Sequence, residues 1–172
     1  MATSTLLQSL NSDADFGGVS TARTSDRSQI ETFVVRNTNG SGVTKAVTAG
    51  QWVSFDTTQT GADRVRCVRV IDTSGGAVGI GVPVVGVALD TVSVAEPSVA
   101  GQSIEVNMRV VVGGYAEGAS VATGGTLGLA LALDTTTSGR ATIADAANVN
   151  ICGVALEDAV SNAADVWVLK QF

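Results

Sequence analysis

Apolar and polar side chains alternate strictly along Ser103–Val110, and this is the clearest periodic pattern in the chain. A period of two places successive side chains on opposite faces of a β-strand, so one face is expected to be buried and the other solvated. The apolar face consists of Ile104, Val106, Met108 and Val110, and the polar face of Ser103, Glu105, Asn107 and Arg109. The pattern therefore predicts a half-buried strand.

Four further segments have the apolar content of strands. Glu31–Arg36 precedes a glycine-rich loop, and Val166–Phe172 ends the sequence. Arg64–Val70 alternates and then slips by one position, which predicts a β-bulge at Cys67–Val68. Leu127–Leu133 has leucines on one face and small residues on the other. Since no segment after residue 30 keeps a helical period over ten residues, the chain is predicted to be all-β.

The sequence contains two similar β modules with their parts in the same order. Ala49–Thr58 resembles Gly125–Thr136, because in both a glycine opens an apolar strand that ends in Asp-Thr-Thr. Pro83–Asp90 resembles Asn150–Asp158, because both carry Gly-Val-Ala-Leu followed by an acidic residue. The first pair is offset by 78 positions and the second by 67, so the first copy is longer by 11 residues, which we assign to the glycine-rich stretch 71–81. A shared order of elements predicts an internal duplication.

This duplication divides the chain into three parts. Residues 1–30 form a predicted extended N-terminal arm, residues 31–112 a first β module with the insertion at 71–81, and residues 113–172 a second β module. Each module is expected to be a small barrel or sandwich. In the second module, the small side chains of one strand face would let another layer or another subunit approach closely. These candidates for an oligomer interface are Gly128, Ala130 and Ala132.

The predicted arm is rich in Ser, Thr, Asp and Gly and shows no strand alternation. Its large apolar side chains are Leu6, Leu7, Leu10 and Phe16. Two interpretations stay open: a solvated terminus, and an arm whose apolar groups dock on a partner. A solvated tail has little use for three leucines and a phenylalanine, so these four residues are the candidates for contact with a partner.

Composition narrows the classes of function. Hydrophobic residues make up 45% of the chain and charged residues only 15%, which suggests apolar surface covered by a partner or by oligomerisation. The net charge is −6, and the cations are scattered except for Arg64, Arg66 and Arg69, so nucleic-acid binding is not expected. No secretory signal opens the sequence, and no apolar run is long enough for a membrane helix. We therefore expect synthesis in a cytosol and no contact with a membrane.

The sequence offers few groups for catalysis. It has no histidine, which excludes Ser-His-Asp and Cys-His nucleophilic sites and histidine-based metal sites. Cys67 and Cys152 lie within apolar strand patterns, which favours two buried thiols, and a disulfide between them stays open. The glycine-rich stretch 75–81 lacks the Lys-Ser/Thr that a phosphate loop requires. We expect no enzyme activity, no cofactor and no metal.

The two Gly-Val-Ala-Leu segments, each following a strand that ends in Asp, resemble the small capsid decoration (cement) proteins of tailed bacteriophages. The resemblance covers the region from Val43 to Phe172. The matching segments of the first copy are Phe55-Asp56, Gly86–Asp90 and Ile104–Val110, and those of the second copy are Leu133-Asp134, Gly153–Asp158 and Val166–Leu169.

This resemblance implies a homotrimeric structural protein of the virion. Such a protein lies on the outer surface of an icosahedral head, where it binds the major capsid protein and bridges neighbouring capsid subunits. The alternative is a host- or glycan-binding spike or adhesin module of a virion. The aromatic content of 4% argues against the alternative, because sugar-binding faces favour Trp and Tyr.

Overall fold

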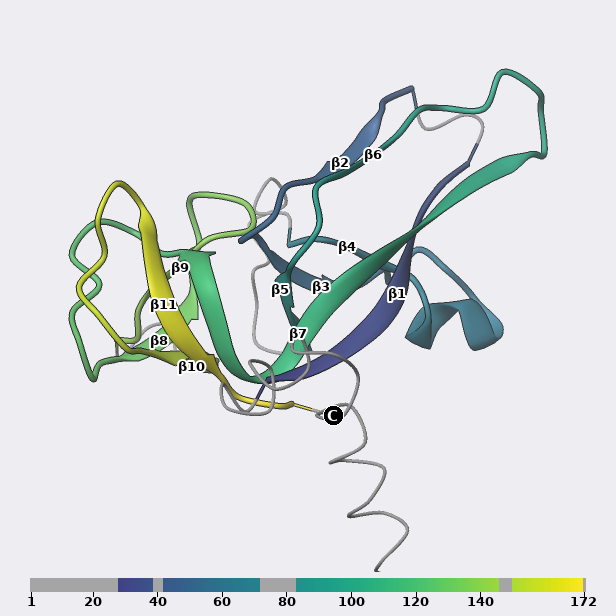
Figure 1. The fold of residues 1–172 in the computed structure, drawn as a ribbon. Helices are drawn as coiled ribbons and strands as arrows, with labels where there is room; N and C mark the ends of the chain where they lie inside the picture. The colour runs from purple at the N-terminus through teal and green to yellow at the C-terminus, as the bar shows by residue number, and fades with distance from the viewer. Residues whose placement is uncertain (1–27, 39–41, 72–82, 146–149, 172) are drawn as a thin grey trace, which may run out of the picture.

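The described part of the chain is nearly all β-strand (Figure 1). The structure is a computed structural model that describes residues 28–38, 42–71, 83–145 and 150–171. A short 3-10 helix, η2 (Gly61–Val65), lies between the third and fourth strands. The strands are β1 (Gln29–Thr38), β2 (Lys45–Val47), β3 (Trp52–Phe55), β4 (Val68–Val70), β5 (Val84–Ala88), β6 (Val92–Val94), β7 (Ser103–Ser120), β8 (Ala130–Leu133), β9 (Ala141–Ile143), β10 (Ile151–Ala155) and β11 (Ala163–Val168). The prediction of an all-β fold is confirmed.

Strand β7 runs through both halves of the molecule. It is 18 residues long, and it pairs with β1 and β5 through its first part and with β11 through its second part. The main sheet has nine strands, in the order β4-β3-β5-β7-β11-β10-β8-β9 with β1 also paired to β7, while β2 and β6 form a separate sheet. Figure 1 shows β7 as a long bent strand with a group of strands at either end. We call residues 28–112 the first unit and residues 113–171 the second unit.

The two units have the same strand order. It is β4-β3-β5-β7 in the first unit and β9-β8-β10-β11 in the second. The registers also agree, because Val53 pairs with Gly86 and Leu131 pairs with Gly153, each beside a register shift. Thus β3 is equivalent to β8, β4 to β9, β5 to β10, and the first part of β7 to β11. An internal duplication predicts this correspondence.

Each unit closes on itself as a small barrel. In the first unit β1 pairs with β7, and a parallel bridge joins its Val34 to Cys67, directly before β4. In the second unit the last part of β7 pairs with β11, and a parallel bridge joins Val121, directly after β7, to Ala141 of β9. Strand β7 is therefore the last strand of one barrel and the first strand of the next. The boundary expected between residues 112 and 113 lies inside this strand.

The additional residues of the first unit fall in two loops, which corrects their assignment to 71–81 alone. Twelve residues (56–67) link β3 to β4, whereas seven (134–140) link β8 to β9. Thirteen residues (71–83) link β4 to β5, whereas seven (144–150) link β9 to β10. The first difference arises because η2 is inserted before β4.

Helix η2 also replaces the start of the strand predicted at Arg64–Val70, and β4 begins only at Val68. The backbone N–H groups of Arg66 and Cys67 both donate to the carbonyl oxygen of Asp63, at 3.2 and 2.9 Å. These bonds complete a helical turn directly before the strand. The slip in alternation therefore marks a change from helix to strand, and the predicted bulge is wrong.

The alternating segment Ser103–Val110 is confirmed as the start of β7. Met108 and Val110 are buried and Arg109 is exposed, as the alternation predicts. Ile104, expected on the buried face, is exposed. At Ile104, β7 pairs with β1 alone, because β5 pairs with β7 only at Val110 and Val111. The barrel core therefore does not reach Ile104.

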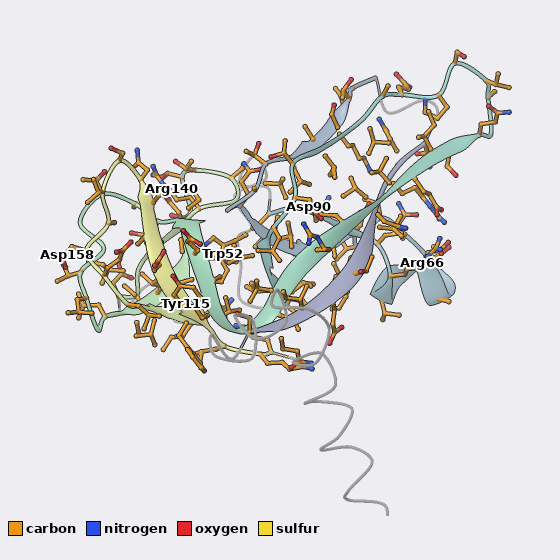
Figure 2. The ribbon with its side chains drawn as sticks, viewed as in Figure 1. Trp52, Arg66, Asp90, Tyr115, Arg140 and Asp158 are labelled. Carbon is orange, nitrogen blue, oxygen red and sulfur yellow. The ribbon has the colours of Figure 1, made fainter. Side chains whose placement is uncertain are left out.

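The two barrels share apolar contacts as well as a strand. The core cluster of the second unit includes five residues of the first unit, namely Trp52, Ile71, Val84, Val87 and Val111. Trp52 is fully buried, and its indole N–H donates to the carbonyl oxygen of Ser120 at 3.1 Å. Its ring lies 3.1 Å from the position that a Cβ atom on Gly153 would occupy. Figure 2 shows Trp52 between the two units. The buried ring therefore holds the units together.

Two equivalent glycines allow neighbouring strands to approach closely. A Cβ atom on Gly86 would lie 1.9 Å from the carbonyl oxygen of Val111, and one on Gly153 would lie 2.8 Å from that of Trp167. Val111 and Trp167 are equivalent positions of β7 and β11. Heavy atoms do not approach so closely, so both barrels require glycine at this position.

Replacing Gly86 by alanine should destabilise the fold by at least about 3 kcal/mol, because the added methyl group collides with backbone that cannot move alone. Gly101→Ala is the matched control. Gly101 also has a positive φ of 78°, but no heavy atom lies within 4 Å of its Cβ position. Its cost should be about 1–2 kcal/mol from backbone conformation. Urea denaturation measures both, and equal losses would contradict the role of the close approach.

Candidate interaction surfaces

The three predicted interface residues lie in different environments. Gly128 is exposed and Ala130 is half-buried. Ala132 is 0% exposed, because it pairs with Ile151 on one side and with Thr142 on the other and is covered within the chain. Contrary to expectation, Ala132 has no surface to offer a second subunit. The candidates in the predicted arm, Leu6, Leu7, Leu10 and Phe16, lie outside the described residues.

Two leucines that looked like core residues in the sequence are on the surface. Leu127 and Leu129 are 63% and 41% exposed, because β8 begins only at Ala130. The equivalent residues of the first unit are Ala49 and Gln51. This replacement of a small and a polar residue by leucines is the sequence signal that could have indicated exposed apolar surface in the second unit.

Two buried aspartates form equivalent turns. Asp56 follows β3 and Asp134 follows β8, and both are almost completely buried. The backbone N–H and the hydroxyl of Thr58 donate to Asp56 at 3.1 and 2.7 Å. The same groups of Thr136 donate to Asp134, both at 2.7 Å. The Asp-Thr-Thr repeat seen in the sequence is thus a repeated turn.

A cation balances each of these carboxylates. Lys45 Nζ lies 3.4 Å from Asp56, and Arg140 Nε lies 2.6 Å from Asp134. Burial raises the pKa of Asp134, but hydrogen bonds from Thr136 and Arg140 outweigh burial and hold that pKa below its usual range. The same balance lowers the pKa of Asp56. Both carboxylates are occupied in holding turns.

Charged side chains beside η2 pair with one another. Arg36 Nη1 lies 2.7 Å from Asp63, and Arg36 also pairs with Glu105. Arg66 is labelled in Figure 2, and its Nη2 lies 2.9 Å from Glu105. Hydrogen bonds raise the pKa of Arg36, and the bond to Asp63 has a larger effect than the bond to Glu105. The charges of Arg36 and Arg66 are therefore balanced within the chain.

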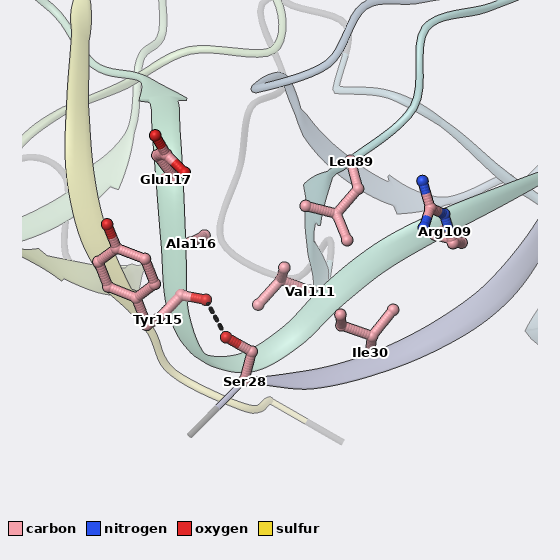
Figure 3. Close-up of a pocket in the computed structure, with 8 residues that line it drawn as sticks. All are labelled: Ser28, Ile30, Leu89, Arg109, Val111, Tyr115, Ala116 and Glu117. Carbon is pink, nitrogen blue, oxygen red and sulfur yellow. Dashed lines mark hydrogen bonds between the residues drawn. The ribbon is translucent and has the colours of Figure 1, made fainter. Parts of the chain in front are cut away.

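A cleft of about 270 Å³ lies where the units meet, at the bend of β7 (Figure 3). Its apolar wall consists of Ile30, Leu89, Val111 and Ala116. The hydroxyl of Ser28 donates to the carbonyl oxygen of Tyr115 at 2.6 Å. Arg109 also lines the cleft, but its guanidinium lies 2.6 Å from Asp90, which balances its charge. The cleft therefore suits contact with an apolar side chain better than binding of an anion.

Cys67 and Cys152 are free and buried, so the prediction of two buried thiols is confirmed. Burial raises the pKa of Cys152 to about 12, which keeps this thiol neutral. Within residues 28–38, 42–71, 83–145 and 150–171, no group of three or more His, Cys, Asp or Glu side chains could hold a metal ion. In the same ranges, no helix has the length and apolar character to cross a membrane.

Comparisons with known proteins assign no family to the chain. No protein-family model matches it, and no curated protein matches it. Among solved structures, it is similar to the N base of the head fiber gp8.5 of bacteriophage phi29, with a TM-score of 0.39 and 14% sequence identity. The alignment covers 82% of this chain and 95% of that one.

Asp134→Ala removes the acceptor that organises the turn after β8, and should cost about 1.5–3 kcal/mol of unfolding free energy near neutral pH. Because the pKa of Asp134 is lower in the folded state, its stabilisation is present above the unfolded pKa of about 4 and is lost as the pH falls through the folded pKa. The gap between wild type and variant should therefore narrow in acid.

Urea denaturation from about pH 2 to pH 7 measures this gap. The control is Glu117→Ala, because Glu117 is exposed and its loss should change stability by less than about 0.5 kcal/mol. A gap for Asp134→Ala that stays constant with pH would show that the carboxylate charge has no part in holding the turn.

Proposed function

We propose that this chain is a non-enzymatic structural protein of a tailed-bacteriophage virion. It binds the outer surface of the icosahedral head as a homotrimer and stabilises the head by bridging neighbouring major capsid subunits. Its partner is the major capsid protein. In this proposal the chain binds no cofactor, no nucleic acid and no membrane.

The observation that carries the proposal is the place of the two Gly-Val-Ala-Leu segments, which bear the resemblance to capsid decoration proteins. They lie in β5 and β10, which are equivalent strands of the two barrels: β5 lies between β3 and β7, and β10 lies between β8 and β11. The acidic residue after each one binds the next strand: Asp90 accepts from the N–H of Arg109 at 2.8 Å, and Glu157 from that of Asp165 at 2.9 Å. The motif thus builds a repeated structural unit, which is buried in β5 but leaves Val154 half-buried and Leu156 exposed in the second copy.

A rigid pair of barrels is suited to bridging. Because β7 belongs to both barrels and Trp52 is buried between them, contacts made by one unit constrain the other. A specific protein interface typically buries about 1,600 Å² in total. Each bound copy would add such an area between capsid subunits, and the symmetry of the head repeats the gain at every equivalent position.

The arm predicted at residues 1–30 is too long, because β1 begins at Gln29 and takes its last two residues into the first barrel. In this proposal residues 1–27 make the attachment. Its apolar candidates are Leu6, Leu7, Leu10 and Phe16. Each of these side chains contributes about 1.5–3 kcal/mol when it is fully buried against a partner. An extended segment can also add a strand to an exposed sheet edge, where backbone hydrogen bonds supply the affinity.

The second candidate function, a host- or glycan-binding spike module, is favoured by one observation. Tyr115 and Trp167 lie opposite each other in β7 and β11, and both are half-buried. Such amphipathic rings could stack on a sugar. However, the hydroxyl of Tyr115 already donates to Asp165 at 2.5 Å. Binding to empty heads without any binding to glycans would decide for the first candidate.

Deletion of residues 2–27 should abolish binding to empty heads assembled from the major capsid protein, while the fold is kept. The described core clusters involve residues from Ile30 onward, so both barrels retain them. Co-sedimentation with heads measures binding, and circular dichroism with a melting curve checks the fold. Unchanged co-sedimentation would remove the segment from the proposal. Failure of the full-length chain to sediment with heads would refute the proposed function.

Light scattering at micromolar concentration should give a mass about three times the 17.3 kDa of one chain. Association is expected because charged residues are scarce and apolar side chains such as Ile151 and Leu156 are exposed. A clean monomer at every concentration would contradict the homotrimer.

A further inference from the structure

The face through which the first unit packs onto the second unit consists of apolar side chains from β3, β5, β7 and the residues next to them. In the core cluster of the second unit, five of these residues are buried and one is partly buried. They are Trp52, Ile71, Val84, Val87, Leu89 and Val111. This contact shows that the outer face of a barrel of this kind is suited to docking.

The register of the strands identifies the same face on the second unit. In the first unit Trp52, Val87 and Val111 form one row across β3, β5 and β7. The equivalent row of the second unit consists of Ala130, Val154 and Trp167. The equivalence continues beside this row, because the N–H of Leu89 donates to β7 at 2.9 Å and that of Leu156 donates to β11 at 2.8 Å.

We call the six equivalent positions of the second unit the open face. They are Ala130, Ala144, Ile151, Val154, Leu156 and Trp167. None of these six side chains is buried: Ile151 is 42% exposed, Leu156 is 39% exposed, and the other four are half-buried. One face is thus covered within the chain, and its counterpart is exposed. A contiguous apolar face of this kind marks an interaction site.

Acidic residues surround the open face. Glu157 and Asp158 are exposed directly after Leu156, and Asp145 is exposed directly after Ala144. Residues 113–172 carry six Asp and Glu but only two Lys and Arg, whereas residues 28–112 carry seven Asp and Glu and six Lys and Arg, so the first unit is the less acidic of the two. Two open faces placed against each other would bring like charges together. Contact with the first unit of another copy brings fewer like charges together, and it repeats the order of units found within the chain.

We infer that the open face binds the first unit of a second copy of this chain. The contact is head to tail, so three copies can close into a ring. The inference rests on the proposed function, because it names the interface of the proposed homotrimer. A stable interface needs about 800 Å² from each partner, which is more than six residues cover. The open face is therefore the apolar centre of a larger contact.

The test is the double variant Ile151→Ser/Leu156→Ser in the full-length chain. Both side chains are partly in solvent already, so the barrel should still fold. Sedimentation and light scattering at micromolar concentration should show about a threefold fall in mass, from trimer to monomer. The matched control is Leu127→Ser/Val160→Ser, which removes two second-unit side chains that are 63% and 72% exposed and lie outside the open face. The control should remain a trimer.

The single variant Leu156→Gln keeps the test decisive if circular dichroism shows that the double variant is unfolded. It should raise the dissociation constant of the trimer about tenfold, which corresponds to 1.4 kcal/mol. A trimer of unchanged affinity in the folded open-face variants overturns the inference and leaves the homotrimer standing. Equal loss of the trimer in the control also overturns it.

A wild-type chain that stays monomeric overturns both the open-face contact and the homotrimer. Binding of the same wild-type chain to empty heads is measured separately. It decides the proposed virion function whatever the mass measurements show.

Discussion

The indole ring of Trp52 joins the two barrels, and the arrangement of the molecule depends on this contact. The ring is fully buried, its N–H donates to Ser120, and one ring edge lies against Gly153. A side chain at Gly153 would collide with the carbonyl group of Trp167 and press tightly against this ring. A buried tryptophan contributes several kcal/mol, so this contact fixes β3 of one barrel against β10 of the other.

The two units share a backbone plan but differ on their outer faces. Where the first unit has Trp52, the second has Ala130. Arg109, which pairs with Asp90 in the first unit, is replaced by Asp165 in the second. A large apolar side chain and a cation are therefore present on the face that the chain covers itself. The uncovered face carries Trp167 and smaller apolar side chains among acidic groups, and its exposure underlies its proposed role as a contact between copies.

The sequence patterns predicted some structural features correctly and others wrongly. The alternation around Met108 located a half-buried strand, and the repeated Asp-Thr-Thr placed Asp56 and Asp134 at the ends of equivalent strands. The same pattern failed at Arg64–Val70, where a period of two cannot distinguish a bulge from a helical turn before a strand. For the interaction surface, Gly128 and Ala130 were identified as candidates. The exposure of Ile151 and Leu156 was not, because isolated apolar residues at strand ends look like core.

The sequence by itself determined the half-buried strand around Met108, the two glycine positions in β5 and β10, and the two aspartates that end equivalent strands. Each of these depends on backbone geometry and on hydrogen bonds between residues a few positions apart, so it leaves a local signal. Only the tertiary structure decided that β7 belongs to both barrels, that Trp52 is buried against the second unit, and that the equivalent face of that unit is exposed. These features depend on contacts between residues far apart in the chain. The periodicity of a single segment carries no information about which other segment covers it.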